Sequence, residues 1–324
     1  MSTEHPGFEV DALRAGLRPI VPGKRVLLTP EEDAYLRHYD IHFSEEFADL
    51  THHFGSVAAP EHRIAVHLWM PAGARGTATV IHGYFDHTGL YGHLIRYLID
   101  KGLAVVSFDL PGHGLSSGAP ATIDTFQHYV DAFEACLAAL GDHLPKPWYL
   151  FGQSTGGAIA MEWLLANGHT RESTPFAKVV LLAPLVRPYL WPLNRVLYTL
   201  ARRFVSERPR TFTNNAENAA FLDFLRERDP LQAKTLPVQW VTAMIAWKRR
   251  FESHAPSDIA PLVVQGHADQ TVDWRYNMKV ISRLFEPRLF FIPEARHHLV
   301  NESPAVRARI FEAIDAELAG GEAG

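Results

Sequence analysis

The chain has 324 residues and a net charge of −5, with 47% hydrophobic and 21% charged residues. These values are typical of a water-soluble globular protein, and the negative charge argues against a nucleic-acid partner. A single cysteine, Cys136, excludes an intramolecular disulfide and a metal site built on cysteines. Residues 1–6 lack the basic and apolar regions of a secretion signal, and no apolar run is long enough to span a bilayer. We therefore expect a cytoplasmic protein.

The first part of the chain is predicted to be an extension followed by a pair of strands. Residues 1–50 form the N-terminal extension. It contains its own helix, because Thr29 is a good N-cap residue, Pro30 suits the first helical position and acidic residues follow. Two antiparallel strands are expected next, over residues 51–59 and 62–70, leading into the main sheet.

A series of short apolar runs, separated by helical patterns, predicts the main sheet. The runs lie at 77–81, 103–108, 148–151, 178–182, 262–264 and 289–292, and a final helix is expected from Pro304. Strands that are apolar on both faces and alternate with helices imply a parallel sheet covered on both sides. The predicted fold class is therefore α/β, with a doubly covered, mostly parallel sheet.

Residues 185–258 interrupt this alternation. They carry helical patterns but no convincing strand, and they are rich in tryptophan, tyrosine, leucine and arginine. A long insertion inside a compact domain usually has a function, often as a lid. We expect a helical cap inserted before the strand at 262–264, with the core formed by residues 51–184 and 259–324.

The stretch Gly152-Gln153-Ser154-Thr155-Gly156 has the form G-x-S-x-G. It lies between the strand predicted at 148–151 and a helical run over 157–165. A serine at such a sharp turn has a crowded backbone, which the two glycines relieve, and its hydroxyl is held out at the edge of the sheet. The helix behind it offers free N–H groups to a developing anion. Ser154 is therefore a candidate nucleophile.

A serine hydroxyl needs a base to activate it, and the base needs a carboxylate to orient it. On this type of fold the acid and then the histidine follow the serine along the chain. Asp269 comes just after the strand at 262–264, and His297 just after the strand at 289–292. Because the carboxyl ends of parallel strands share one edge of the sheet, we expect these two side chains to meet Ser154.

Each of these two assignments has a rival. Asp273 lies four residues after Asp269, where we expect it to begin the following helix and to complement its dipole, so Asp269 is preferred. His298 is adjacent to His297, and only one of two neighbouring loop residues can face the serine. Spacing alone favours His297 slightly.

Acyl transfer also needs N–H donors for the oxyanion of the tetrahedral intermediate. One donor is expected to be the amide of Thr155, directly after the nucleophile. The other is expected from the loop after the first central strand, where Gly83 permits a close approach. The amide of Tyr84 is preferred, with that of Phe85 as the second choice. His82 precedes this loop and is interpreted as structural, rather than as the base.

The histidines of the chain do not predict a metal site. There are 18 of them, but the pairs His52-His53 and His297-His298 lack a spacing framed by carboxylates. The motif H-E-x-x-H is missing from the sequence. We expect neither a metal nor a cofactor.

Several segments resemble motifs of the α/β-hydrolase superfamily and, within it, of the monoacylglycerol lipase and lysophospholipase-like branch. They are His82-Gly83-Tyr84-Phe85-Asp86-His87 (H-G-x-x-x-H), Asp109 to Ser116 (D-x-x-G-H-G-x-S), Gly152 to Gly157, Asp229-Pro230-Leu231 (D-P-L), Gln265 to Asp269 (Q-G-x-x-D), and Ala295 to Leu299 with Glu302 (G/A-x-x-H). The resemblance covers about residues 60–318. It implies a Ser–His–Asp enzyme that hydrolyses esters, with a cap that shapes an acyl pocket, and it favours His297 over His298.

The sequence departs from this pattern at three positions. Gln153 stands where histidine is common, and the bulky Tyr84 and Phe85 follow His-Gly where a small residue is usual. We expect the two aromatic residues to narrow the pocket. The predicted substrate is a small lipophilic ester such as a monoacylglycerol or a lysophospholipid. The alternatives are an acyltransferase that uses the same triad and, less favoured because the cap shows no acidic cluster for a free N-terminus, a peptidase.

The apolar stretch Tyr189 to Leu193 in the cap has two interpretations. Such a stretch could contact lipid or a hydrophobic substrate, since exposed apolar patches often mark binding surfaces. It could equally pack between the cap and the core, and packing is the preferred interpretation.

Overall fold

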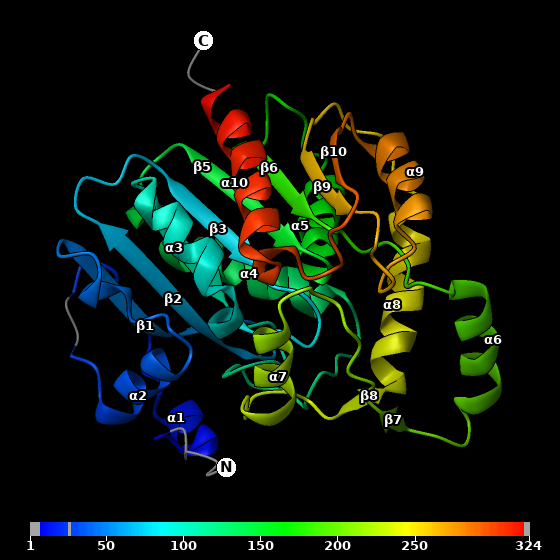
Figure 1. The fold of residues 1–324 in the computed structure, drawn as a ribbon, viewed down its shortest axis with the longest axis horizontal. Helices are drawn as coiled ribbons and strands as arrows, with labels where there is room; N and C mark the ends of the chain where they lie inside the picture. Colours follow the sequence, from blue (N-terminus) through cyan, green and yellow to red (C-terminus); the bar gives the residue numbers. More distant parts are fainter. Residues whose placement is uncertain (1–6, 25–26, 321–324) are drawn as a thin grey trace.

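An eight-stranded sheet forms the centre of the computed structural model, which describes residues 7–24 and 27–320 (Figure 1). Its strands are β1 (Leu50–Ala58), β2 (Arg63–Pro71), β3 (Thr77–Ile81), β4 (Ala104–Phe108), β5 (Trp148–Gln153), β6 (Phe176–Leu182), β9 (Leu262–Gly266) and β10 (Arg288–Ile292). They are arranged in the order β1-β2-β4-β3-β5-β6-β9-β10. β1 and β2 pair antiparallel, as does β2 with β4, and all the pairs from β4 to β10 are parallel. The predicted mostly parallel sheet is confirmed.

Helices cover both faces of the sheet. On one face lie α3 (Gly92–Asp100) and α10 (Pro304–Ala319), which stand in front of the strands in Figure 1. On the other face lie α4 (Gln127–Leu140), α5 (Thr155–Ala166) and α9 (Trp274–Leu284). The buried side chains accordingly form two clusters, one on each side of the sheet. Burial of both faces explains why the central strands are apolar along their whole length.

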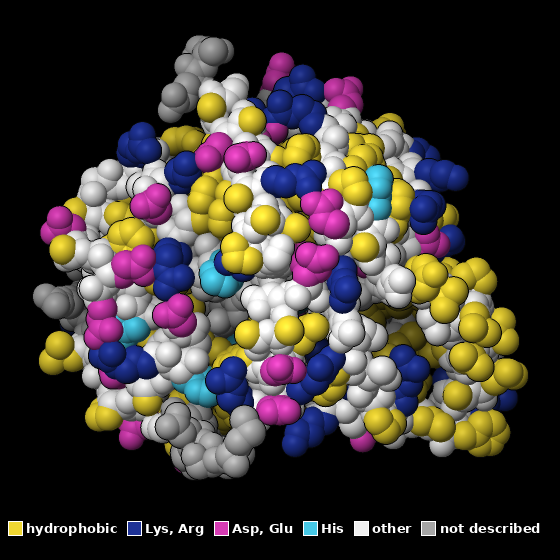
Figure 2. Space-filling view, viewed as in Figure 1, with side chains coloured by type: hydrophobic (Ala, Val, Ile, Leu, Met, Phe, Trp, Pro, Cys, Tyr) yellow, Lys and Arg dark blue, Asp and Glu magenta, His cyan; other side chains and the backbone are white. Residues whose placement is uncertain are grey.

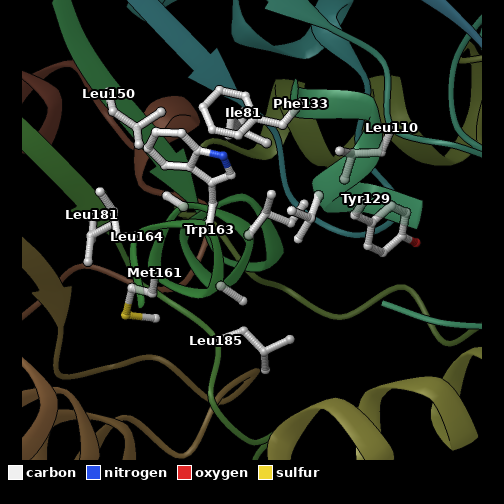
Figure 3. Close-up of a cluster of buried hydrophobic side chains, with 14 of the residues drawn as sticks. Ile81, Leu110, Tyr129, Phe133, Leu150, Met161, Trp163, Leu164, Leu181 and Leu185 are labelled. Carbon is white, nitrogen blue, oxygen red and sulfur yellow. The ribbon is translucent and has the colours of Figure 1, made fainter. Parts of the chain in front are cut away.

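Helix α5 is anchored by large side chains in one of these clusters. Figure 3 shows Trp163 of α5 beside Leu150 of β5 and Phe133 of α4. The rings of Trp163 and Phe133 meet edge to face at 5.4 Å. Every residue of α5 except Ala166, the last, is buried. The start of α5 is therefore held rigidly against the carboxyl end of β5, where Ser154 lies.

The N-terminal extension packs onto the sheet beside β1. It contains α1 (Val10–Gly16), α2 (Pro30–His38) and a short 3₁₀ helix (Phe43–Glu45). The predicted start of α2 is confirmed, since Thr29 and Glu32 cap it reciprocally. Tyr35 and Leu36 of α2 are fully buried in the same cluster as α3 and α10. Residues 1–6, on which the expectation about a secretion signal depends, lie outside the described residues.

The insertion between β6 and β9 contains α6 (Trp191–Ala201), β7 (Glu207–Pro209), α7 (Ala219–Glu227), β8 (Thr235–Pro237) and α8 (Val238–Phe251). The expectation that it lacks strands is wrong, because β7 and β8 pair antiparallel. Each has three residues and ends in a proline, which is too short for alternating hydrophobicity to show in the sequence. α8 packs on the core through Trp247 and Phe251. Below, "cap" means residues 185–258, a division that we propose from the sequence. Among the described helices, none is both long and apolar enough to cross a bilayer.

Candidate active site

Ser154 occupies the turn between β5 and α5 in a strained backbone conformation. Its φ is 52° and its ψ is −111°, a region that residues with a side chain seldom adopt. A Cβ at Gly156 would lie 2.1 Å from the carbonyl oxygen of Ile81, and one at Gly152 would lie 2.6 Å from the backbone of Gly156. Gly156 is therefore required by the close packing of this turn against β3, and Gly152 by the close approach of β5 to the start of α5.

The side chains of Ser154, His297 and Asp269 form a continuous line of hydrogen bonds. The Oγ of Ser154 lies 2.9 Å from Nε2 of His297, and Nδ1 of His297 lies 2.8 Å from Oδ2 of Asp269. Because a carboxylate can only accept, the ring proton lies on Nδ1, which leaves Nε2 free to accept from the serine hydroxyl. The other oxygen of Asp269 accepts from the amides of Thr271 and Val272, which fixes the carboxylate. All three side chains are buried.

The electrostatics of the pair favour a charged imidazolium beside a charged carboxylate. Burial by itself would lower the pKa of His297, but the charge of Asp269 and the hydrogen bond to it raise that pKa above its ordinary value. Burial by itself would raise the pKa of Asp269, but His297 and the groups that donate to the carboxylate hold that pKa below its ordinary value. The arrangement therefore stabilises the proton that His297 would take from Ser154.

The two rival residues point elsewhere. Asp273 caps α9 by accepting from the amide of Tyr276, and it forms an ion pair with Arg187 at 2.7 Å. Nε2 of His298 lies 3.2 Å from Oδ2 of Asp86. The structure therefore brings Asp269 and His297 to the serine, and it gives Asp273 and His298 other partners.

The residues of both predicted oxyanion donors line the same cavity as Ser154. The amide of Thr155 is at the first position of α5, and Tyr84 lines the same cavity as Ser154. Within the described residues, neither amide donates to a protein acceptor. Phe85 has a φ of 69°, so this loop also holds a strained conformation. His82 accepts from the amide of Leu110 and holds the loop from behind, as a structural residue.

Two polar residues that the sequence did not single out as functional hold the loop of His297. The side-chain amide of Gln153 donates to the carbonyl oxygen of His297 at 2.7 Å. From the cap, the carbonyl oxygen of Asn215 accepts from the amides of both His297 and His298. Gln153 was noticeable only as a departure from the family pattern. Asn215 acts through its backbone, so its side chain left no signal in the sequence.

Glu302 completes this support. Its fully buried carboxylate accepts from the amide of Arg296 at 2.6 Å and from the amide of Glu217 at 2.7 Å. The first amide precedes His297, and the second belongs to the cap. Glu302 was noted in the sequence as part of the histidine motif, and the contacts give the reason: it joins the histidine loop to the cap.

A second buried pair joins three parts of the chain. His87, from the H-G-x-x-x-H segment, lies 3.0 Å from Asp229 of the cap. The hydroxyl of Tyr39, in the N-terminal extension, donates to the same carboxylate at 2.7 Å. Burial by itself would lower the pKa of His87, but Asp229 raises it above its ordinary value, and the pKa of Asp229 is correspondingly held low. The two family motifs at these positions therefore fasten the cap to the core.

A cavity of about 350 Å³ opens above Ser154 and His297. Its apolar walls come from both the core and the cap: Leu185, Leu225, Leu236, Trp240 and Val272. The ring of Tyr84 stacks on that of Trp240 at 3.7 Å, so the loop that follows β3 and the cap are in direct contact. Within the described part of the chain, no group of three or more metal-ligating side chains could hold a metal ion.

Two curated relatives align with most of the chain. The human protein called monoglyceride lipase is 29% identical over 260 residues, which covers 76% of this chain and 84% of the human protein. The monoacylglycerol lipase of Mycolicibacterium smegmatis is 27% identical over 252 residues, covering 74% of this chain and 88% of the relative.

Solved structures share the fold. The crystal structure of the Paleococcus ferrophilus monoacylglycerol lipase aligns with a TM-score of 0.62 at 20% identity, covering 79% of this chain and 99% of that chain. A soluble variant of the Saccharomyces cerevisiae monoglyceride lipase, solved in complex with a substrate analogue, aligns with a TM-score of 0.68 at 17% identity, covering 83% of this chain and 94% of that chain. At these identities the likeness shows the α/β-hydrolase fold alone.

The family itself follows from a longer match. The model of the family described as serine aminopeptidase, S33, matches residues 72–304, which is more than half of the chain. The matched region begins before β3 and ends at the start of α10, so it includes the elbow, the cap and the histidine loop. The chain therefore belongs to this family of α/β hydrolases, is a hydrolase, and falls on its monoacylglycerol lipase-like branch.

Proposed function

We propose that this hydrolase cleaves carboxylic esters with Ser154 as nucleophile, His297 as general base and acid, and Asp269 as the orienting carboxylate. The observation that carries the proposal is the pair of hydrogen bonds, 2.9 Å and 2.8 Å long, that joins the three side chains. Such a line, at the end of parallel strands and beside a helix N-terminus, matches the requirements of acyl transfer.

In the first half of the reaction, Nε2 of His297 takes the proton of Ser154 as Oγ attacks the ester carbonyl carbon. The amides of Tyr84 and Thr155 donate to the resulting oxyanion, and Asp269 stabilises the imidazolium. When the carbon–oxygen bond to the alcohol breaks, His297 gives its proton to the leaving alcohol. In the second half, water attacks the acyl-enzyme, His297 takes its proton, and Ser154 regains a proton as the acid is released.

The cavity supports a lipophilic ester as substrate. Apolar side chains form one part of its lining, among them Leu185, Leu236 and Trp240, and polar and charged side chains form the rest. The curated relatives are named as monoacylglycerol or monoglyceride lipases, which favours a lipid ester with one acyl chain. Tyr84 and Phe85 line the cavity together with Ser154. We expect their rings to narrow it, so we place shorter acyl chains ahead of long ones.

A peptidase is disfavoured despite the family's description. Among the described residues, Asp86 is the one carboxylate in the cavity lining, and it is already paired with His298. A free α-ammonium group would therefore find no unpaired carboxylate there. An acyltransferase would use the same three residues and pass the acyl group to an alcohol or thiol acceptor; analysis of products with an added acceptor separates it from a hydrolase.

The cap also supports contact with a lipid surface. Leu193, Val196, Leu197 and Leu200 on α6 are each more than half exposed, as is Leu190 before it. Figure 2 shows apolar side chains gathered over this helix, which projects from the body of the molecule. The preferred interpretation of the apolar stretch, packing on the core, is wrong for Leu190 and Leu193. An apolar surface of this kind at the cap would bring the cavity to a source of lipophilic substrate.

The cytoplasmic location expected from the sequence stays a prediction.

The decisive test compares wild type with Ser154→Ala on p-nitrophenyl esters of graded chain length, monoacylglycerols, lysophospholipids and aminoacyl p-nitroanilides. We expect ester turnover to fall by about 10³–10⁶-fold in the variant. Ser206→Ala, an exposed serine of the cap, is the matched control and should keep wild-type turnover. Near-normal esterase activity in Ser154→Ala would refute the assignment, and turnover of the anilides alone would replace the esterase with a peptidase.

A further inference from the structure

The cavity above Ser154 contains two arginines from the cap. Arg208 lies on β7, and Arg210 directly follows this strand. The amide of Arg210 still bonds to the carbonyl oxygen of Lys234, so the ladder with the opposite strand continues to this residue. Side chains two apart on a strand point to the same side. Both arginines accordingly line the cavity that also contains Ser154.

Arg210 is held in place by aromatic rings. Its guanidinium carbon lies 4.1 Å from the centre of the Phe85 ring and 4.5 Å from that of Phe212. One terminal nitrogen, Nη1, donates to the side chain of Gln232 and to the carbonyl oxygen of Ala233. Among the residues that the structure describes, Nε and Nη2 have no acceptor. The guanidinium is thus fixed in orientation, with part of its donor edge unused.

The charge of Arg210 also lacks a carboxylate in contact. Two carboxylates lie near enough to act on it through space, Asp86 and Asp229. Each is already paired with a histidine: Asp86 with His298 at 3.2 Å and Asp229 with His87 at 3.0 Å. Burial lowers the pKa of Arg210 despite these two neighbours. The free nitrogens of Arg210 are not among the buried unpaired atoms, so they are accessible from the cavity. An anionic group bound there would pair with this partly buried cation and offset the cost of its burial.

We propose that Arg210, assisted by Arg208, binds an anionic group of the substrate, so that the preferred ester carries a phosphate or a carboxylate besides its acyl chain. The inference rests on the proposed ester hydrolysis and names the substrate class for that same site. A planar guanidinium with free N–H groups matches the paired oxygens of either anion, whereas a neutral glyceride would leave the cation unpaired. Because Arg210 stacks on Phe85, next to Tyr84, the anion would bind beside the oxyanion loop.

The test uses two matched pairs of soluble short-chain esters. The first pair is octanoyl glycerol and octanoyl glycerol phosphate, which differ by a phosphate on the alcohol side. The second is p-nitrophenyl hexanoate and the mono-p-nitrophenyl ester of adipic acid, which differ by a carboxylate at the end of the acyl chain. The readout in each pair is the ratio of kcat/KM for the anionic ester to kcat/KM for the neutral one.

We expect wild type to prefer the anionic ester by about tenfold or more in at least one pair, and the pair that shows the preference places the anion on the alcohol or the acyl side. Arg210→Gln should lower this ratio by about 10–100-fold, the range for losing a charge-assisted hydrogen bond, and Arg210→Lys should lower it less. Arg249→Gln, which removes an exposed arginine of α8 outside the cavity, is the control and should keep the wild-type ratio.

A wild-type ratio near one in both pairs would overturn the proposal, and this measurement does not depend on the folding of any variant. The proposal would also be overturned if folded Arg210→Gln lowered kcat/KM for the anionic and the neutral ester of a pair by the same factor, because the arginine would then be structural. Failure of the proposed function would be visible separately, as the absence of turnover of the neutral esters by wild type.

Discussion

The side-chain amide of Gln153 donates a 2.7 Å hydrogen bond to the backbone carbonyl oxygen of His297. The residue before the proposed nucleophile thus holds the loop of the proposed base. Both residues are buried, so this bond is not replaced by water when it is lost. The backbone carbonyl oxygen of Asn215 accepts from the amide of His297. Gln153 and Asn215 therefore hold both the carbonyl and the amide group of His297.

Replacing Gln153 with leucine should lower kcat/KM by about 10–100-fold, because a small displacement of the base costs much of the benefit of its alignment. The change keeps a side chain of similar size but removes the donor. Ester turnover and thermal unfolding of the variant should be measured together. The control is Gln127→Leu. In wild type the side-chain amide of Gln127 donates to Asp131 within α4, away from the site, so losing this bond should leave kcat/KM unchanged. Wild-type activity in Gln153→Leu would show that the bond does not position His297.

The rate should depend on the protonation of His297. Since protonated imidazole cannot accept the serine proton, kcat/KM should fall as the pH drops through the pKa of His297, with a midpoint above the ordinary value of about 6.5. Asp269→Asn removes the charge that raises this pKa, so the midpoint should move to lower pH and kcat should fall by about 10³–10⁴-fold. A pH–rate profile of both proteins from pH 5 to about 9 tests both effects. A profile for wild type that is flat over this range would exclude His297 as the base.

The sequence predicted the sheet and the meeting of the three candidate side chains because both follow from local patterns. Apolar runs bounded by turns place β3 and β9 within a few residues of their observed limits. The side chains of Asp269 and His297 meet Ser154 because the carboxyl ends of parallel strands share an edge. Neither conclusion required knowledge of distant contacts.

Contacts between segments far apart in the chain were beyond such patterns. The pair of Asp229 with His87 spans the cap and the core, and Tyr39 joins them from the N-terminal extension. The hydrophobic pattern of α6 indicates an apolar face but not whether that face meets protein or solvent. For this reason the exposed position of Leu193 could not be predicted from the sequence.

Asp229→Ala should lower the free energy of unfolding by about 3–5 kcal/mol, because it leaves His87 buried without its partner. The pKa of His87 is raised in the folded state, so its contribution is fully present below the unfolded pKa of about 6.5 and is lost as the pH rises through the folded pKa. The difference between wild type and variant should therefore be larger near pH 6 than near pH 9.

Urea unfolding at the two pH values measures this difference for the Asp229→Ala variant. Asp223→Ala, an exposed carboxylate on α7, is the control and should change stability little at either pH. If the loss of stability in Asp229→Ala is the same at both pH values, then the charge of His87 contributes nothing to the free energy of unfolding.

The double variant Leu197→Ser, Leu200→Ser should bind less to vesicles of phosphatidylcholine. Both side chains are more than half exposed on α6, and transferring each into lipid would bury apolar area. We expect the partition coefficient to fall by about tenfold or more, as measured by cosedimentation, with turnover of a water-soluble ester retained. Leu27→Ser, which removes a leucine that is 81% exposed and lies in the N-terminal extension, should bind as wild type does. Equal vesicle binding by all three proteins would remove α6 from any lipid contact.

Gly156→Ala should disturb the elbow itself. The added Cβ would lie 2.1 Å from the carbonyl oxygen of Ile81 and 2.7 Å from that of His82, and neither backbone atom can move without shifting β3 or the oxyanion loop. We expect the free energy of unfolding to fall by about 1–3 kcal/mol. We also expect kcat to fall, because Ser154 moves with the turn. Gly16→Ala provides the contrast, since a Cβ at the end of α1 meets no atom within 4 Å. That variant should be as stable as wild type or more so, because alanine is favoured over glycine in a helix. The contrary result would be a Gly156→Ala variant that unfolds at the wild-type denaturant concentration and keeps the wild-type kcat. It would show that the close packing of the elbow against β3 does not hold Ser154 in its strained conformation.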